Sequence, residues 1–154
     1  MREILFRGQT RRYGEKVRMG DGQPLPSRWV YGGVLQGVGS HSIIYGGENV
    51  DDPGEGLNKW AVYTDTLGQY TGILDKNDKR IFEGDIVRVQ DNIITSPFCD
   101  GITGKVVYDE CAFFIEPKNP MDSQWLFNEC AVYEVIGNIH DNPELLDGER
   151  NCNG

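Results

Sequence analysis

Alternating apolar and polar positions run through most of the chain and predict β-strands joined by turns. The most informative stretch is residues 69–89, in which β-prone residues flank a cluster of turn-forming residues at 75–79 and so predict a hairpin. A further β-branched strand begins at Ile86, after a bend at Gly84. The expected fold class is therefore all-β, with several short antiparallel strands.

The same alternation predicts where the remaining strands lie. They are expected over residues 3–7, 28–35, 42–45, 60–63 and 130–139, and the strand at 42–45 is expected to be the hairpin partner of the strand at 28–35. Two more strands are expected in residues 104–116, around a turn at Asp109-Glu110. A helical signal occurs near the C-terminal end, where Asn142 suits an N-cap and Pro143 suits the first helical position. One short helical turn is expected there.

The length of 154 residues suits one domain, or two small subdomains that share a core. We expect an N-terminal β-subdomain over residues 1–80, a C-terminal β-subdomain over residues 81–147 and a flexible tail over residues 148–154. From Ile81 onward, the order of bend, strand, long loop, hairpin, strand and helical turn is that of a small SH3-like barrel. Because SH3-like barrels serve many functions, this analogy selects none of them.

Three blocks of the sequence occur in the order found in a known family. They are MREILFRG at the start, QYTGILDKNDKRIFEGDIV in the middle and YEVIGNIHDNPELL near the end. Together they resemble the YopX family of bacteriophage and prophage proteins. The family more often has glycine at the position of Asp78, and this departure predicts a different type of hairpin connection. The resemblance implies an all-β phage protein of unknown molecular function.

The net charge of −9 is distributed unevenly, because residues 1–18 carry +4 and the remainder carries −13. An acidic bulk repels the phosphate backbone, so nucleic-acid binding is disfavoured. A nucleic-acid-binding module that uses the basic N-terminal segment is kept as the alternative function. Its contact residues would be Arg2, Arg7, Arg11, Arg12, Tyr13, Lys16 and Arg18. A simpler interpretation of these charges is a solvated strand face, and an acidic DNA mimic is a further alternative that rests on charge alone.

Cysteine spacing and hydropathy exclude several classes of site. The cysteines are Cys99, Cys111, Cys130 and Cys152. They form no C-x-x-C pair, so we expect no zinc site and no other cofactor. The pair Gly37-x-Gly39 has no helix after it and does not fit a phosphate-binding loop. The chain has no long apolar run or signal peptide, so we expect no membrane association and a reduced, cytoplasmic location in the host bacterium.

Acidic and imidazole groups at predicted strand ends form the best candidate for catalysis. This cluster consists of Glu83, Asp85, His140 and Asp141. The four groups would converge if the strand from Ile86 paired with the strand at 130–139. The favoured interpretation is that Asp85 and Asp141 accept hydrogen bonds from turn backbone and that His140 lies on the surface. We therefore predict no catalytic residues and no enzyme activity.

Aromatic residues support a binding module instead. The chain carries Trp29, Tyr31, Trp60, Tyr63, Tyr70, Trp125 and Phe127. Most of them should be buried, and any that stay exposed beside acidic residues would suit a protein partner with a basic surface. The expected function is that of a phage or prophage accessory protein that binds an unidentified protein partner without catalysis. Exposed strand edges also predict self-association into a homo-oligomer.

Overall fold

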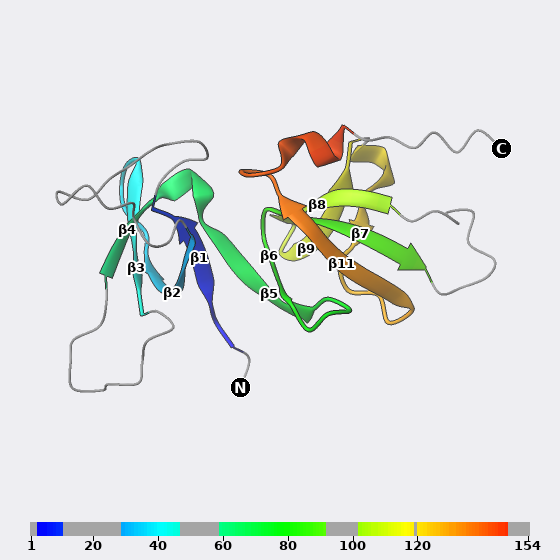
Figure 1. Cartoon of the computed structure of the whole chain (residues 1–154), viewed down its shortest axis with the longest axis horizontal. Coiled ribbons are helices and arrows are strands. Elements are labelled where there is room, and N and C mark those ends of the chain that lie inside the picture. Colours follow the sequence, from blue (N-terminus) through cyan, green and yellow to red (C-terminus); the bar gives the residue numbers. More distant parts are fainter. Residues whose placement is uncertain (1–2, 11–28, 47–58, 92–101, 119, 148–154) are drawn as a thin grey trace. The chain divides into compact units, whose positions relative to one another are not determined.

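The computed structural model describes residues 3–10, 29–46, 59–91, 102–118 and 120–147 (Figure 1). Within these ranges the regular elements are β-strands and 3-10 turns, which confirms the all-β class. The chain divides into two compact units, an N-terminal unit of residues 1–70 and a C-terminal unit of residues 71–154. The boundary predicted after residue 80 lies inside the second of these units.

Six strands form the first antiparallel sheet, in the order β4-β3-β2-β1-β5-β6. Their bounds are β1 Phe6–Gln9, β2 Trp29–Leu35, β3 His41–Tyr45, β4 Lys59–Tyr63, β5 Gly68–Leu74 and β6 Arg80–Phe82. β2 and β3 pair as predicted, with Val34 opposite Ile44. One face packs a small core of Val30, Ile44 and Val62, since alternate residues of each strand point to the same side.

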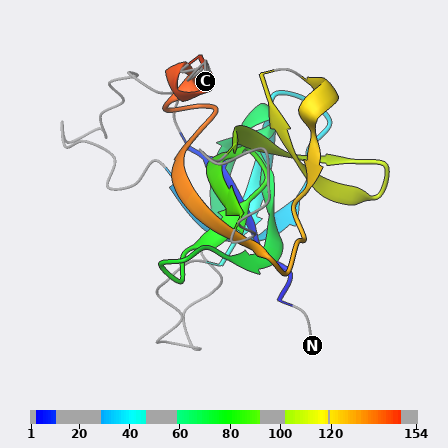
Figure 2. The same cartoon turned by 90° about the vertical axis from the view of Figure 1, so that its right-hand side faces the viewer.

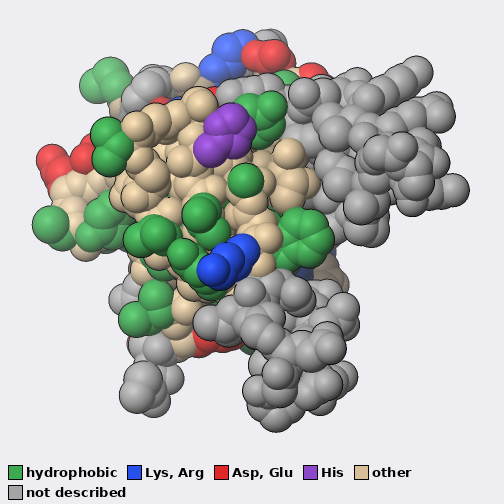
Figure 3. Space-filling view, turned by 90° about the vertical axis from the view of Figure 1, so that its left-hand side faces the viewer, with side chains coloured by type: hydrophobic (Ala, Val, Ile, Leu, Met, Phe, Trp, Pro, Cys, Tyr) green, Lys and Arg blue, Asp and Glu red, His purple; other side chains and the backbone are tan. Residues whose placement is uncertain are grey.

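The opposite face of β3 and β4 remains partly exposed. On β3, Ser42 and Ile44 are buried, whereas His41, Ile43 and Tyr45 alternate with them on the other side. Figure 3 shows hydrophobic side chains gathered on this side of the N-terminal unit, around a histidine and a basic residue.

Five strands form the second antiparallel sheet, in the order β10-β9-β8-β7-β11. Their bounds are β7 Asp85–Asp91, β8 Ile102–Asp109, β9 Ala112–Pro117, β10 Gln124–Trp125 and β11 Ala131–Asn138. In Figure 2, β8 and β9 are the yellow-green strands of this sheet and β11 is the orange strand. Among the described residues, no pairing joins β10 to β11, so the predicted SH3-like barrel is not shown.

Three short 3-10 turns complete the described structure: Thr64–Thr66, Pro120–Asp122 and Pro143–Leu146. The last one confirms the helical turn predicted at Pro143. The side chain of Asn142, however, makes no capping hydrogen bond. The turn is thus stabilised by its own backbone, in which the amide of Leu145 donates to the carbonyl oxygen of Asn142 over 3.1 Å.

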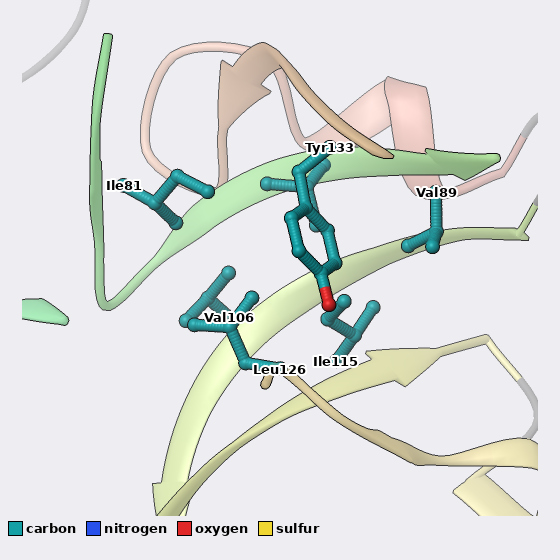
Figure 4. Packing of buried hydrophobic residues seen from close by; sticks show 7 residues of the cluster. Ile81, Val89, Val106, Ile115, Leu126 and Tyr133 are labelled. Atoms are coloured by element: carbon teal, nitrogen blue, oxygen red, sulfur yellow. The ribbon is translucent and has the colours of Figure 1, made fainter. Parts of the chain in front are cut away.

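The main core lies in the C-terminal unit. Figure 4 shows this cluster, whose members are Ile81, Val87, Val89, Val106, Ile115, Leu126 and Tyr133. They come from β6, β7, β8, β9 and β11 and from the residue after β10. Burying side chains of this size contributes about 1.5–3 kcal/mol each, so this cluster holds the five-stranded sheet and its neighbours together.

Two turns use left-handed backbone at residues other than glycine. Between β8 and β9, Glu110 and Cys111 have φ values of 45° and 65°. The two predicted strands are confirmed, but the turn centres one residue later than Asp109-Glu110. At Asp78, φ is 60°. This is the region that glycine enters without strain, so the connection at Asp78 still uses a conformation that favours glycine.

Candidate protein interaction surface

The predicted acidic cluster lies at the end of β7 and β11, which pair as the catalytic hypothesis required. Asp85 is opposite Asn138 in this pairing. Its side chain is only 1% exposed, and its Oδ2 accepts a hydrogen bond from the amide of Phe82 over 2.8 Å. Asp85 therefore closes the turn between β6 and β7, as the structural interpretation expected.

Asn138 organises the other half of this region. Its Oδ1 accepts hydrogen bonds from the amides of His140 and Asp141, both over 3.0 Å, and its Nδ2 donates to Oδ2 of Asp141 over 3.0 Å. His140 is half-buried rather than surface-exposed. Within the described ranges, no group of three or more His, Cys, Asp or Glu side chains could hold a metal ion. The side chains of Asp85 and Asn138 thus fix backbone at the strand ends, and Asp141 holds the side chain of Asn138 rather than the turn backbone predicted for it.

The basic N-terminal residues are described only in part. Arg7 lies on β1 and is 6% exposed, with its guanidinium carbon 4.6 Å from the centroid of the Trp29 ring. This cation–π contact draws the side chain into the sheet, away from an approaching phosphate. Arg2, Arg11, Arg12, Tyr13, Lys16 and Arg18 lie outside the described residues. The nucleic-acid contact stays a prediction for those six residues.

The aromatic residues separate into buried and exposed groups. Tyr70 is buried, and Trp60 packs against the core of the N-terminal unit. Trp29, Tyr31 and Tyr63 are half-buried. Trp125 and Phe127, by contrast, are 62% and 71% exposed. These two side chains therefore provide the large apolar surface that a binding module needs.

The exposed rings of Trp125 and Phe127 lie on either side of Leu126, where β10 ends. Leu126 lies between them and is 1% exposed, because it enters the main core. Its two neighbours must then point outward. Trp125 lies opposite Phe114 of β9, and the two ring centroids are 4.5 Å apart at an interplanar angle of 35°. We call Phe114, Trp125 and Phe127 the aromatic patch.

Sequence reasoning assigned Phe114 to a strand but not to this surface. The signal was the pair Phe113-Phe114, since consecutive strand residues point to opposite faces. Phe113 packs against the main core and Phe114 joins the aromatic patch. Asn138 was likewise missed, although an Asn two residues before His140-Asp141 suits local backbone hydrogen bonding.

The aromatic patch belongs to the acidic part of the protein. The N-terminal unit contains eight acidic and eight basic residues, whereas the C-terminal unit contains sixteen acidic and seven basic residues. The whole formal charge of −9 is therefore carried by the C-terminal unit. Asp122 and Glu129 flank β10 in sequence and are exposed, and Glu110 is exposed in the β8–β9 turn, four residues before Phe114. The surface around the rings thus attracts cations.

Comparison with known proteins gives a family and a similar solved structure. No curated protein matches the chain. The crystal structure of protein EF1440 from Enterococcus faecalis is similar at 22% sequence identity and a TM-score of 0.42, covering 94% of this chain and 98% of that chain. Within the described residues, no helix is long and apolar enough to cross a membrane. The family model described as YopX protein matches residues 30–147. Because this match covers more than half of the sequence, the chain belongs to the YopX family.

Proposed function

We propose that the chain is a phage or prophage accessory protein that acts by non-catalytic association with another protein, through the aromatic patch. The observation that carries this proposal is the exposure of Trp125, whose ring contacts Phe114, and of Phe127 two residues further along the chain. Clustered exposed aromatic side chains are costly to leave in water, and they are enriched in protein interfaces as binding hot spots. A protein partner that covers these rings would remove them from water, which the core of this chain does not do.

The partner surface is expected to be basic. The C-terminal unit carries all of the net charge, and Asp122, Glu129 and Glu110 lie in the segments that border the aromatic patch. Complementary charge speeds encounter and selects partners more than it adds affinity. Binding should therefore combine an apolar contact that resists salt with an association rate that falls as salt increases.

The arrangement of the acidic cluster supports a non-catalytic role. A general acid or base must reach a substrate, but Asp85 is buried and holds the amide of Phe82, and Asp141 accepts from Asn138. These bonds explain why the sequence has acidic residues at these positions without assigning them to a reaction.

We expect a Trp125→Ala/Phe127→Ala double variant to lose partner binding while it keeps its fold. Truncating two exposed hot-spot rings should weaken affinity by about 30-fold or more, since the loss of even one hot spot costs about 2 kcal/mol or more. The measurement is affinity capture of the partner from phage-infected cells, followed by titration of the isolated partner against each variant. Both side chains are exposed, so the circular dichroism spectrum and the urea midpoint should be close to those of the wild type.

The matched control is Ile4→Ala/Val38→Ala, which removes two exposed apolar side chains from the N-terminal unit. This variant should bind the partner as the wild type does. Equal binding by the wild type and the Trp125→Ala/Phe127→Ala variant would show that the partner uses another surface, and the proposed function of the aromatic patch would then be wrong.

A further inference from the structure

The two edge strands of the five-stranded sheet, β10 and β11, differ in whether other described parts of the chain bind their outward backbone groups. At the β11 edge, the loop after β5 occupies the outward backbone groups. The amide of Lys76 donates to the carbonyl oxygen of Tyr133 over 2.9 Å, and the amide of Val135 donates to Oδ2 of Asp75 over 3.0 Å. These contacts cover the edge, in the manner by which proteins prevent unwanted strand pairing.

The β10 edge has outward backbone groups of its own. The amide of Leu126 donates to the carbonyl oxygen of Phe113 over 3.0 Å, so Leu126 faces β9. Neighbouring residues of a strand direct their backbone groups to opposite sides, and the N–H and C=O of Trp125 therefore point away from β9. β10 ends the sheet, and no described strand pairs with it on that side.

We propose that the β10 edge binds an extended, basic segment of the partner protein as an added antiparallel or parallel strand. This inference rests on the proposed function and specifies the mode of binding at the same site. Strand addition supplies main-chain hydrogen bonds, and side chains of the added strand supply specificity. Here the backbone of Trp125 offers a donor and an acceptor directly beside the aromatic patch.

The chemistry of the surface selects lysine or arginine in the added strand. A cation placed over a tryptophan ring is attracted by its π face. The exposed Trp125 offers such a ring, and Asp122 and Glu129 lie in the segments on either side of it. Alternate residues of an added strand point to one face, so lysines at every second position would all point to the face that carries the Trp125 ring.

The net charge also disfavours binding of a second copy of this chain at the β10 edge. Two C-terminal units, each with a formal charge of −9 over the whole unit, would then meet. Like charges brought into one interface oppose association, whereas a lysine-rich segment neutralises them. The edge is thus suited to a basic partner.

The probe that tests this inference is a synthetic peptide of alternating lysine and valine, capped at both ends. Two matched peptides accompany it: one has glutamate in place of lysine, and one has methylated backbone amides at alternate residues, which cannot donate to an edge strand. Binding to the full chain is followed by calorimetry and by amide NMR shifts. We expect the lysine peptide to bind, with the largest shifts in β9, β10 and residues 126–128.

Methylation of the peptide backbone should weaken binding by about tenfold or more, because the peptide N–H that donates to the carbonyl oxygen of Trp125 is lost and the methyl groups prevent close approach of the two strands. The glutamate peptide should not bind. Raising the salt from about 50 mM to about 500 mM should weaken the lysine peptide, because screening shortens the reach of the charges. The Trp125→Ala variant should also bind it more weakly, and the Ile4→Ala variant should bind it as the wild type does.

Equal binding of the methylated peptide would overturn strand addition. So would the largest shifts in the N-terminal unit, or no binding of the lysine peptide at all. If the amide NMR shifts at β10 changed with protein concentration in the absence of peptide, the edge would instead bind a second copy of the chain. In each case, the proposed function would still hold if capture of the partner continued to depend on Trp125 and Phe127. If capture did not depend on these two residues, both the proposed function and the strand-addition proposal would be wrong.

Discussion

Replacing Asp75 by alanine is expected to lower the free energy of unfolding by about 3 kcal/mol, because one buried carboxylate serves three backbone donors. Its Oδ1 accepts from the amides of Asn77 and Lys79 over 2.7 and 3.0 Å. Its Oδ2 accepts from the amide of Val135 on β11 over 3.0 Å. The variant should lose both the order of the 75–79 turn and its attachment to the sheet edge.

The protonation of Asp75 gives the same contact a pH dependence. Burial alone would raise the pKa of Asp75, but hydrogen bonds from Val135, Lys79 and Asn77 and the charge of Lys79 together hold it below its ordinary value. A carboxyl with a lowered folded-state pKa stabilises the fold fully above its unfolded pKa, and this contribution is lost as the pH falls through the folded value. Asp75→Asn should therefore differ from the wild type at pH 7 and approach it below about pH 4.

Urea denaturation followed by circular dichroism measures these differences. Asp109→Ala is the matched control, because its carboxylate accepts only from the neighbouring amide of Glu110 at an exposed turn. The control should stay within about 0.5 kcal/mol of the wild type. An Asp75→Ala variant as stable as the control would contradict the role assigned to this carboxylate.

A Gly32→Ala variant is expected to destabilise the N-terminal unit by about 2–3 kcal/mol, as overpacking does. A Cβ atom at residue 32 would lie 1.9 Å from the carbonyl oxygen of Tyr45, which is backbone of the neighbouring strand β3. A flexible side chain could move aside, but this carbonyl belongs to the sheet. The pairing of β2 with β3 would have to shift.

Gly33→Ala is the control next in sequence. Its added Cβ would meet nothing closer than the same carbonyl oxygen at 4.0 Å. Because glycine in a strand costs conformational entropy, this variant should be equal to the wild type or slightly more stable. Thermal denaturation of both variants tests the difference. Two equally stable variants would show that β2 and β3 are not as closely apposed at Gly32 as the structure has them.

The all-β class was predictable because strand alternation and turn residues are local signals. The pairing of β2 with β3, the two strands around residue 110 and the helical turn at Pro143 all follow from neighbours in sequence. The turn between β8 and β9 was placed one residue early, because neither Glu110 nor Cys111 is a residue that favours left-handed backbone.

Contacts between residues far apart in sequence were not predictable in this way. Arg7 reads as a surface cation, but pairing of β1 with β2 brings it over the ring of Trp29. The outward direction of Trp125 depends on Leu126 entering the core, and the sequence alone left both aromatic neighbours as candidates for burial. The aromatic patch could thus be suspected from composition, but its position beside a sheet edge required the register of β9 and β10.

Hydrogen exchange of the protein with and without its captured partner tests the central claim most directly. If the aromatic patch and the β10 edge bind the partner, amides of residues 112–117 and 124–128 should exchange more slowly in the complex, and those of β3 and β4 should not change. Protection confined to β3 and β4, with residues 124–128 unaffected, would contradict the account.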